Sequence, residues 1–255
     1  MYRPRLIPVL LLRNKGLVKS RQFRDHQYVG DPINAVRIFN DARVDELVFL
    51  DIDASAQGRV IDLEWVKKIT EEADMPLAIG GGISTVSQMQ SIISLGAEKV
   101  ILGSLPLINP DEVKKAVQVL GSSSIVVCVD VMRSKDNQIV GYYLGGKKVI
   151  SRNIIDYLKD LESWGVGEII LQNISADGTQ DGYDRDLFQF LSKELTVPTI
   201  ACGGAKSVSD MVELYRNTNI SAMAAGSLFV HKGIHRAVLI NYPDEVVKSS
   251  FILDV

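Results

Sequence analysis

Apolar runs and helical patterns alternate eight times along the chain. The apolar runs contain few polar positions, which is typical of parallel strands that are buried on both faces. Strands are therefore predicted at residues 6–12, 46–51, 75–79, 99–102, 125–130, 168–172, 197–201 and 222–225.

Segments with apolar residues at helical spacing lie between these runs. Several begin after a residue that can cap a helix, such as Asp31 before Pro32 and Asn109 before Pro110. Helices are predicted at residues 32–42, 63–73, 85–95, 110–120, 152–164, 184–195, 208–216 and 234–242. Eight strand–helix units favour one (β/α)8 TIM barrel over residues 1–255 rather than a doubly wound sheet, which usually has five or six strands.

The two halves of the chain resemble each other. Residues 76–89 align with 198–211, and residues 46–56 align with 168–178, both at an offset of 122. The pair Gly103-Ser104 recurs as Gly226-Ser227 at an offset of 123. The barrel is therefore predicted to consist of two similar half-barrels, whose matching turns face each other across its C-terminal mouth.

Two stretches interrupt the alternation. Residues 13–30 form a long link with five basic side chains, which predicts a lid loop over an anionic ligand; a solvated surface loop is the alternative. Residues 132–150 contain two β-prone runs around Gly145 and Gly146, which predict a hairpin insertion within the barrel.

Glycine-rich turns at the ends of strands suggest two phosphate sites, because glycine lets backbone N–H groups approach an anion. The first candidate phosphate site comprises Gly81, Gly82, Gly103 and Ser104. The second comprises Asp177, Gly178, Gly203, Gly204, Gly226 and Ser227. These glycines could instead serve only tight turns. Two facing sites predict an elongated ligand with a phosphate at each end.

Carboxylates at strand ends point into the mouth of a barrel and are candidates for acid–base chemistry. Asp130 ends the fifth predicted strand and is expected to have a functional role, whereas Asp51 at the end of the second could instead hydrogen-bond loop N–H groups. Leu11 matches Asp130 in the other half, so a second acid is missing. At the opposite end, four strands begin with charges that are either solvated or form an ion-pair ring: Arg5, Glu46, Lys99 and Glu168.

Composition narrows the possible partners. The 255 residues are 46% hydrophobic and 23% charged with a net charge of −3, which argues against a nucleic-acid partner. No apolar run approaches the roughly 18 residues of a membrane span, and buried thiols at Cys128 and Cys202 fit a cytoplasmic protein. The three histidines lack metal-ligand spacing, and no nucleotide fingerprint is present, so neither a metal nor a cofactor is predicted.

Together these residues resemble the cyclase subunit of imidazole glycerol phosphate synthase, the amidotransferase-linked barrel of histidine biosynthesis. The specific motifs are Gly30-Asp-Pro and the stretches at residues 45–55, 80–83, 96–100, 177–184 and 202–205. The resemblance implies that Asp130 is the general acid–base group and that Lys19 and Asp51 match the family's lysine and strand-two aspartate. It also implies that the glycine sites bind a bisphosphate. The four charged strand starts would then gate ammonia from a glutaminase docked at the N-terminal face as a heterodimer.

This chain departs from the family's pattern at the mouth. The second catalytic aspartate is Leu11, an asparagine is Gly103, a threonine is Gln172 and a serine is Cys202. The departures favour a specialised amidation paralogue, similar to the barrels of surface-polysaccharide pathways that supply ammonia to a third protein. The alternatives are a full cyclase that relies on Asp130 and Lys19, a noncatalytic scaffold for the glutaminase, and a related sugar-phosphate isomerase that needs no ammonia.

Overall fold

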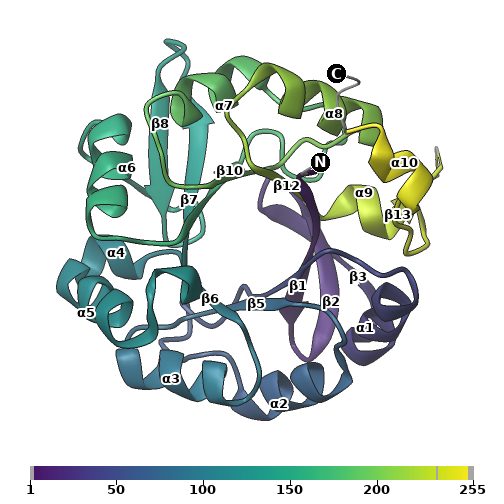
Figure 1. Ribbon diagram of the computed structural model, residues 1–255, viewed down its shortest axis with the longest axis horizontal. Coiled ribbons are helices and arrows are strands. Elements are labelled where there is room, and N and C mark those ends of the chain that lie inside the picture. The colour runs from purple at the N-terminus through teal and green to yellow at the C-terminus, as the bar shows by residue number, and fades with distance from the viewer. Residues whose placement is uncertain (1–2, 234, 252–255) are drawn as a thin grey trace.

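Eight parallel strands close into a barrel within the computed structural model, which describes residues 3–233 and 235–251 (Figure 1). Strand β1 pairs with β12 on one side and with β4 on the other, and β7 pairs with β10, so the sheet has no open edge. The predicted (β/α)8 TIM barrel is confirmed. The barrel strands are β1 (Arg5–Arg13), β4 (Leu47–Asp51), β5 (Leu77–Gly80), β6 (Lys99–Leu102), β7 (Ile125–Arg133), β10 (Glu168–Asn173), β11 (Thr199–Cys202) and β12 (Ala222–Ala225).

Helices surround this barrel on the outside (Figure 1). Their starts are fixed by side-chain caps: Asp31 accepts from the Asn34 N–H, and Thr85 forms a reciprocal capping box with Gln88. The helices are α1 (Pro32–Asp41), α2 (Leu63–Glu72), α3 (Val86–Ser94), α4 (Leu105–Ile108), α5 (Pro110–Leu120), α6 (Ile154–Ser163), α7 (Arg185–Ser192), α8 (Val208–Asn217), α9 (Ser227–Val230) and α10 (Glu245–Ser249), with a 3-10 turn at Ser122–Ser124. Among the helices of the described residues, none is long and apolar enough to cross a membrane.

The last predicted helix, at residues 234–242, is wrong. The chain forms a small antiparallel hairpin there, in which β13 (His231–Lys232) pairs with β14 (Ala237–Val238). Gly233 and Arg236 have φ angles of +76° and +50°, and two left-handed residues so close together cannot continue a right-handed helix. Ile234 lies outside the described residues.

The stretch expected as a lid loop at residues 13–30 forms an antiparallel hairpin. Strand β2 (Gly16–Arg21) pairs with the extended end of β1, and β3 (Arg24–Gly30) pairs with β2. Leu17 and Val18 are buried, which explains why this segment folds onto the barrel. That it moves as a lid stays a prediction.

A second hairpin follows β7, in the segment expected as an insertion. Strand β8 (Ile139–Tyr143) pairs antiparallel with β7 and with β9 (Lys148–Val149). The turn between β8 and β9 has positive φ at Leu144, Gly145 and Gly146.

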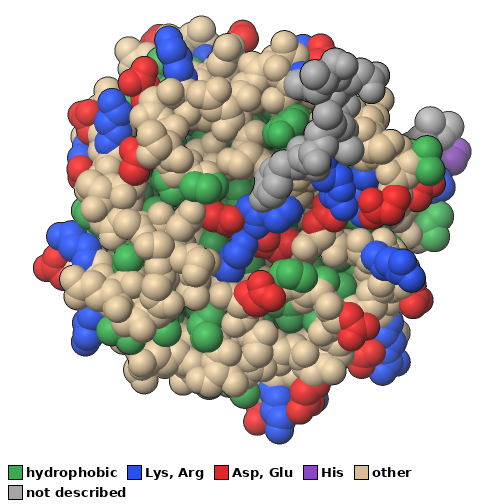
Figure 2. All heavy atoms as spheres, in the orientation of Figure 1, with side chains coloured by type: hydrophobic (Ala, Val, Ile, Leu, Met, Phe, Trp, Pro, Cys, Tyr) green, Lys and Arg blue, Asp and Glu red, His purple; other side chains and the backbone are tan. Residues whose placement is uncertain are grey.

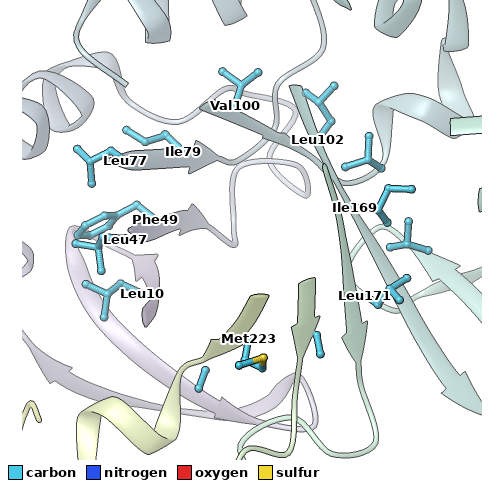
Figure 3. Packing of buried hydrophobic residues seen from close by; sticks show 14 of the residues in the cluster. Leu10, Leu47, Phe49, Leu77, Ile79, Val100, Leu102, Ile169, Leu171 and Met223 are labelled. Atoms are coloured by element: carbon cyan, nitrogen blue, oxygen red, sulfur yellow. The ribbon is translucent and has the colours of Figure 1, made fainter. Parts of the chain in front are cut away.

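Alternate residues of the strands contribute to two separate apolar clusters. The outer cluster packs between strands and helices and includes Leu10, Phe49, Ile79, Leu171 and Met223 (Figure 3). The inner cluster fills the barrel with small and branched residues: Ile7, Val9, Val48, Ala78, Ile101, Val126, Ile170, Ile200, Cys202, Ala222 and Ala224, with Leu11, Leu50 and Cys128 partly buried against it. The inside of the barrel is therefore apolar between its two polar ends.

Candidate functional site

The four charged strand starts form a closed ring at the N-terminal end of the barrel. Arg5 donates to both Glu46 and Glu168, and Lys99 Nζ lies 2.9 Å from Glu46 Oε2 and 3.1 Å from Glu168 Oε2. Figure 2 shows acidic and basic side chains gathered at the centre of the barrel face. Glu46 is only 3% exposed, so these charges form a packed network rather than a solvated rim. A role in passing ammonia stays a prediction.

Asp130 lies at the other end, near the end of β7. It shares the inward-facing parity of Val126 and Cys128, and it is the register partner of Gln172 on β10. Burial raises the pKa of Asp130 to about 7; the charge of Asp177 adds to this, and a backbone hydrogen bond from Gly146 opposes it. A carboxyl group with a pKa near neutrality can both donate and accept a proton, as a general acid–base group must.

Lys19 of β2 is 5% exposed, and its ammonium group points to the second candidate phosphate site. Its Nζ donates to the Val9 carbonyl oxygen and would lie 2.8 Å from a Cβ placed on Gly226. Burial lowers the pKa of Lys19 to about 8, and the charge of Asp177 opposes that shift. The lysine therefore stays mostly protonated at neutral pH, which suits an anionic ligand.

Leu11 lies across the barrel from Asp130. Strands β1 and β7 are four strands apart in the eight-stranded ring, and Leu11 joins the inner apolar cluster beside its register partner Leu50. Gln172 is 8% exposed, and its Nε2 has no hydrogen-bond partner in the part of the chain that the structure describes. The strand position that faces Asp130 is thus apolar, whereas β7 and β10 place the polar side chains of Asp130 and Gln172 side by side.

Asp51 has the structural role that the sequence left open. Its Oδ1 accepts from the backbone N–H groups of Asp53 and Ala54, both at 3.1 Å, and its Oδ2 accepts from Arg59 Nη1 at 2.6 Å. Both oxygens therefore hold the loop after β4. Its assignment to the chemistry stays a prediction.

The first candidate phosphate site rests on this same loop. Gly81 and Gly82 have φ angles of +136° and +62°, and a Cβ on Gly82 would lie 1.8 Å from the Arg59 carbonyl oxygen. By contrast, a Cβ on Gly103 would meet nothing within 4 Å, and Ser104 Oγ accepts from the Leu144 N–H at 3.1 Å. Open space for a ligand is therefore found at Gly103 rather than at Gly82.

The second candidate phosphate site is built on close backbone contacts. Gly178 and Gly203 have φ angles of +68° and +98°, and a Cβ on Gly178 would lie 2.0 Å from the Ser20 carbonyl oxygen. Gly204, with φ of +106°, packs in the same way against Gly182. These three glycines are required by the turns themselves, whether or not an anion binds.

Asp177 anchors the β2–β3 hairpin to this site. Its Oδ2 accepts from Ser20 Oγ at 2.7 Å and from the Phe23 N–H at 3.3 Å, and its backbone carbonyl oxygen accepts from the Gln22 N–H. Burial raises the pKa of Asp177. The carboxylate therefore holds the hairpin in place.

Arg236 is a residue of this site that the sequence reasoning missed. Its Nη1 donates to the Gly178 carbonyl oxygen at 3.0 Å, and its Nη2 lies 3.5 Å from the oxygen of the buried Ser227 hydroxyl. Because Arg236 falls within the helix predicted at residues 234–242, it was not considered as part of a turn beside the site. Gly233, directly before that predicted helix, was the available signal for a turn. Within residues 3–233 and 235–251, no group of three or more His, Cys, Asp or Glu side chains could hold a metal ion.

A closed TIM barrel with facing glycine turns and perturbed titratable groups at its C-terminal mouth defines an enzyme-type barrel. The family model described as "Histidine biosynthesis protein" matches residues 5–235. The chain therefore belongs to this histidine biosynthesis family and is of the HisF type within it. The resemblance found in the sequence is confirmed.

Three relatives illustrate the similarity. A protein of Pseudomonas aeruginosa named "Putative imidazole glycerol phosphate synthase subunit hisF2" is 43% identical over 244 residues, covering 96% of this chain and 97% of the relative. The similarly named hisF3 of Vibrio vulnificus is 45% identical over 244 residues, covering 95% and 94%. The imidazole glycerol phosphate synthase subunit HisF of Alkaliphilus metalliredigens is 38% identical over 229 residues, covering 90% and 91%.

Proposed function

We propose that this chain is the synthase-type subunit of a glutamine amidotransferase complex and that it has weak or no cyclase activity. It receives ammonia from a glutaminase docked at the N-terminal face and binds a bisphosphate-type ligand at the mouth. The observation that carries the proposal is Leu11, which sits in an apolar layer opposite Asp130 while the ring at the other end is complete. It is a specialised amidation subunit that serves a third protein, of the surface-polysaccharide type.

The apolar interior supports the passage of ammonia rather than ammonium. A neutral molecule crosses a layer of valine, isoleucine and alanine side chains at far lower cost than an ion, which loses its hydration there. The ring below this layer is where the molecule would enter. The ion pairs of this ring fix the side chains that surround the entry.

The loss of a second acid supports weak ring closure. Two carboxylates on opposite sides of a substrate can act on both of its faces, and here Asp130 on β7 has Leu11 rather than a carboxylate opposite it on β1. A leucine can neither transfer a proton nor form a charge-assisted hydrogen bond.

A full cyclase is the second candidate, because Asp130 with a pKa of about 7 and the cationic Lys19 are both retained. Rescue of a cyclase-deficient histidine auxotroph by the unmodified chain would favour it.

A noncatalytic scaffold for the glutaminase predicts a different result, since Asp130→Asn would then leave the output of the pathway unchanged. An isomerase barrel would not co-purify with a glutaminase.

Ammonia transfer is tested by opening the ring with Lys99→Met in the complex with the glutaminase. In the Leu11→Asp background, which supplies the missing acid and so a measurable cyclase reaction, glutamate release should continue, whereas product formed from the phosphoribulosyl formimino substrate of the synthase family per glutamine hydrolysed should fall roughly tenfold, or about 1.4 kcal/mol in barrier. Product formed from added ammonium chloride should be unchanged. The measurement is the ratio of product to glutamate.

A matched control is Lys114→Met, because Lys114 pairs with Asp111 at 3.0 Å on the outer helix α5 and is remote from the ring. This control should leave the ratio unaltered. Equal ratios for the two lysine variants would mean that the ring does not control ammonia.

A further inference from the structure

The β13–β14 hairpin brings an arginine to the second candidate phosphate site. In Figure 1, β13 lies beside α9 at the rim of the barrel, where the chain leaves Gly226 and Ser227. Arg236 reaches back from this hairpin to the Gly178 carbonyl oxygen at 3.0 Å and to Ser227 Oγ at 3.5 Å. Gly178 belongs to the loop after β10 and Ser227 to the segment after β12, so a single guanidinium group bridges two of the three loops that form the site.

These contacts prepare the site for an anion. The Gly178 carbonyl oxygen is an acceptor that would repel a phosphate, and the guanidinium group of Arg236 neutralises it. Ser227 Oγ accepts from Arg236, which leaves its own O–H free to donate. A guanidinium group has five N–H donors in a fork that fits phosphate oxygens, and the two contacts use only two of them.

A second observation points to a ligand at the same place. His231, at the start of the hairpin, is 7% exposed, and its Nδ1 has no hydrogen-bond partner among the residues described in the structure. Burial lowers the pKa of His231, and the charges of Arg236 and Lys19 lower it further. A backbone hydrogen bond with Arg236 opposes this shift, so the imidazole has one partner, but its Nδ1 is a buried polar atom without one, which a native structure seldom leaves unexplained.

We propose that Arg236 is a phosphate-binding residue of the second site and that it selects a doubly charged phosphate monoester over a singly charged diester. The inference rests on the proposed function, in which this site takes one phosphate of the ligand. The charge comes from a side chain on the C-terminal hairpin, in addition to the glycine turns and Lys19. The chemical class of ligand is therefore a compound with a terminal phosphate monoester at this end.

The test isolates the second site before it measures binding. Gly103→Asp places a carboxylate in the open space of the first site, where a Cβ meets nothing within 4 Å, and should block phosphate there. In this background, calorimetric titration with inorganic phosphate, methyl phosphate and dimethyl phosphate reports on the second site alone. Methyl phosphate should bind more tightly than dimethyl phosphate.

Arg236→Gln should weaken the binding of inorganic phosphate and methyl phosphate roughly 10- to 100-fold, the factor expected for a lost hydrogen bond to a charged group. It should also reduce the dependence of that binding on ionic strength, because one screened charge is removed. Arg236→Lys should restore the ionic-strength dependence and part of the affinity. A merely structural role of Arg236 would leave the ionic-strength dependence unchanged.

The matched control is Arg37→Gln, because it removes the same charge from an arginine that pairs with Glu72 on the outer surface, and it should not affect phosphate binding. Thermal unfolding without phosphate shows whether each variant is folded. If Arg236→Gln does not fold, the phosphate affinity of Arg236→Lys tests the proposal in its place. If the Gly103→Asp protein binds no phosphate, the proposed bisphosphate function fails together with this inference. If it binds and Arg236→Gln binds equally well, only the role of Arg236 is overturned.

Discussion

Leu11→Asp should raise the turnover of the phosphoribulosyl formimino substrate roughly 10²–10⁴-fold, the usual contribution of one acid–base group. The new carboxylate would face Asp130 across the mouth, where the wild-type protein has an apolar side chain. Position 11 is partly exposed at the mouth, so a charged group there keeps some contact with solvent. The measurement is the rate of imidazole glycerol phosphate formation by the complex with its glutaminase.

The control for this gain is Leu50→Asp. Leu50 is the register partner of Leu11 on the neighbouring strand and belongs to the same partly buried apolar layer, so it introduces the same charge at a similar depth. It should give no gain in rate. A wild-type protein that already turns over at ordinary enzyme rates, or an equal gain from both variants, contradicts the assignment of weak ring closure to Leu11.

Asp130→Asn should stabilise the fold above neutral pH. Burial raises the pKa of Asp130 from 3.8 to about 7, so between these values the folded state binds more protons than the unfolded state. The free energy of unfolding of the wild type therefore falls as the pH rises through this window, and the full cost is present above pH 7. The asparagine variant lacks this cost and should be more stable by roughly 2–4 kcal/mol at pH 8, a gap that closes as the pH falls toward 4.

Urea unfolding at pH 5 and pH 8 measures this gap, and Asp45→Asn provides a control of opposite sign. Burial disfavours the Asp45 carboxylate, but hydrogen bonds from Arg3 and from the Leu6 N–H outweigh it and hold the pKa of Asp45 below its usual range. Its contribution to stability is present at neutral pH and lost as the pH falls through the folded-state pKa. Asp45→Asn should therefore destabilise the protein at pH 8. A gap for Asp130→Asn that is the same at both pH values would show that Asp130 is not an ionised, buried group.

The barrel itself was predictable because each of its strands is a short run of buried residues between capped helices. The ring was predictable in part, since Arg5, Lys99 and Glu168 each start a strand, Glu46 directly precedes one, and parallel strands start at the same end. Their closure into four ion pairs depends on side-chain reach, which a sequence pattern does not show.

The β2–β3 hairpin was harder to predict than the β8–β9 hairpin, whose turn contains Gly145 and Gly146, because its own turn uses residues that seldom adopt left-handed conformations. Gln22 and Phe23 form the β2–β3 turn with φ of +53° and +60°, where asparagine and glycine are usual, so no turn signal is visible. The contacts of Arg236 were also not predictable from the sequence. Its contacts join residues 58 and 9 positions away in the chain, and only the folded hairpin makes them.

The β8–β9 turn lies between the two candidate phosphate sites and contacts the surroundings of both. Its Leu144 N–H donates to Ser104 Oγ at the first site, while a Cβ on Gly146 would lie 3.3 Å from the ring of Phe23, on the hairpin that Asp177 anchors at the second site. Under the proposed function, a molecule long enough to engage both sites would therefore contact two hairpins that this one turn already joins. A fragment with a single phosphate would contact only one of them, so the length of a ligand, and not only its charge, would affect how firmly the rim is held.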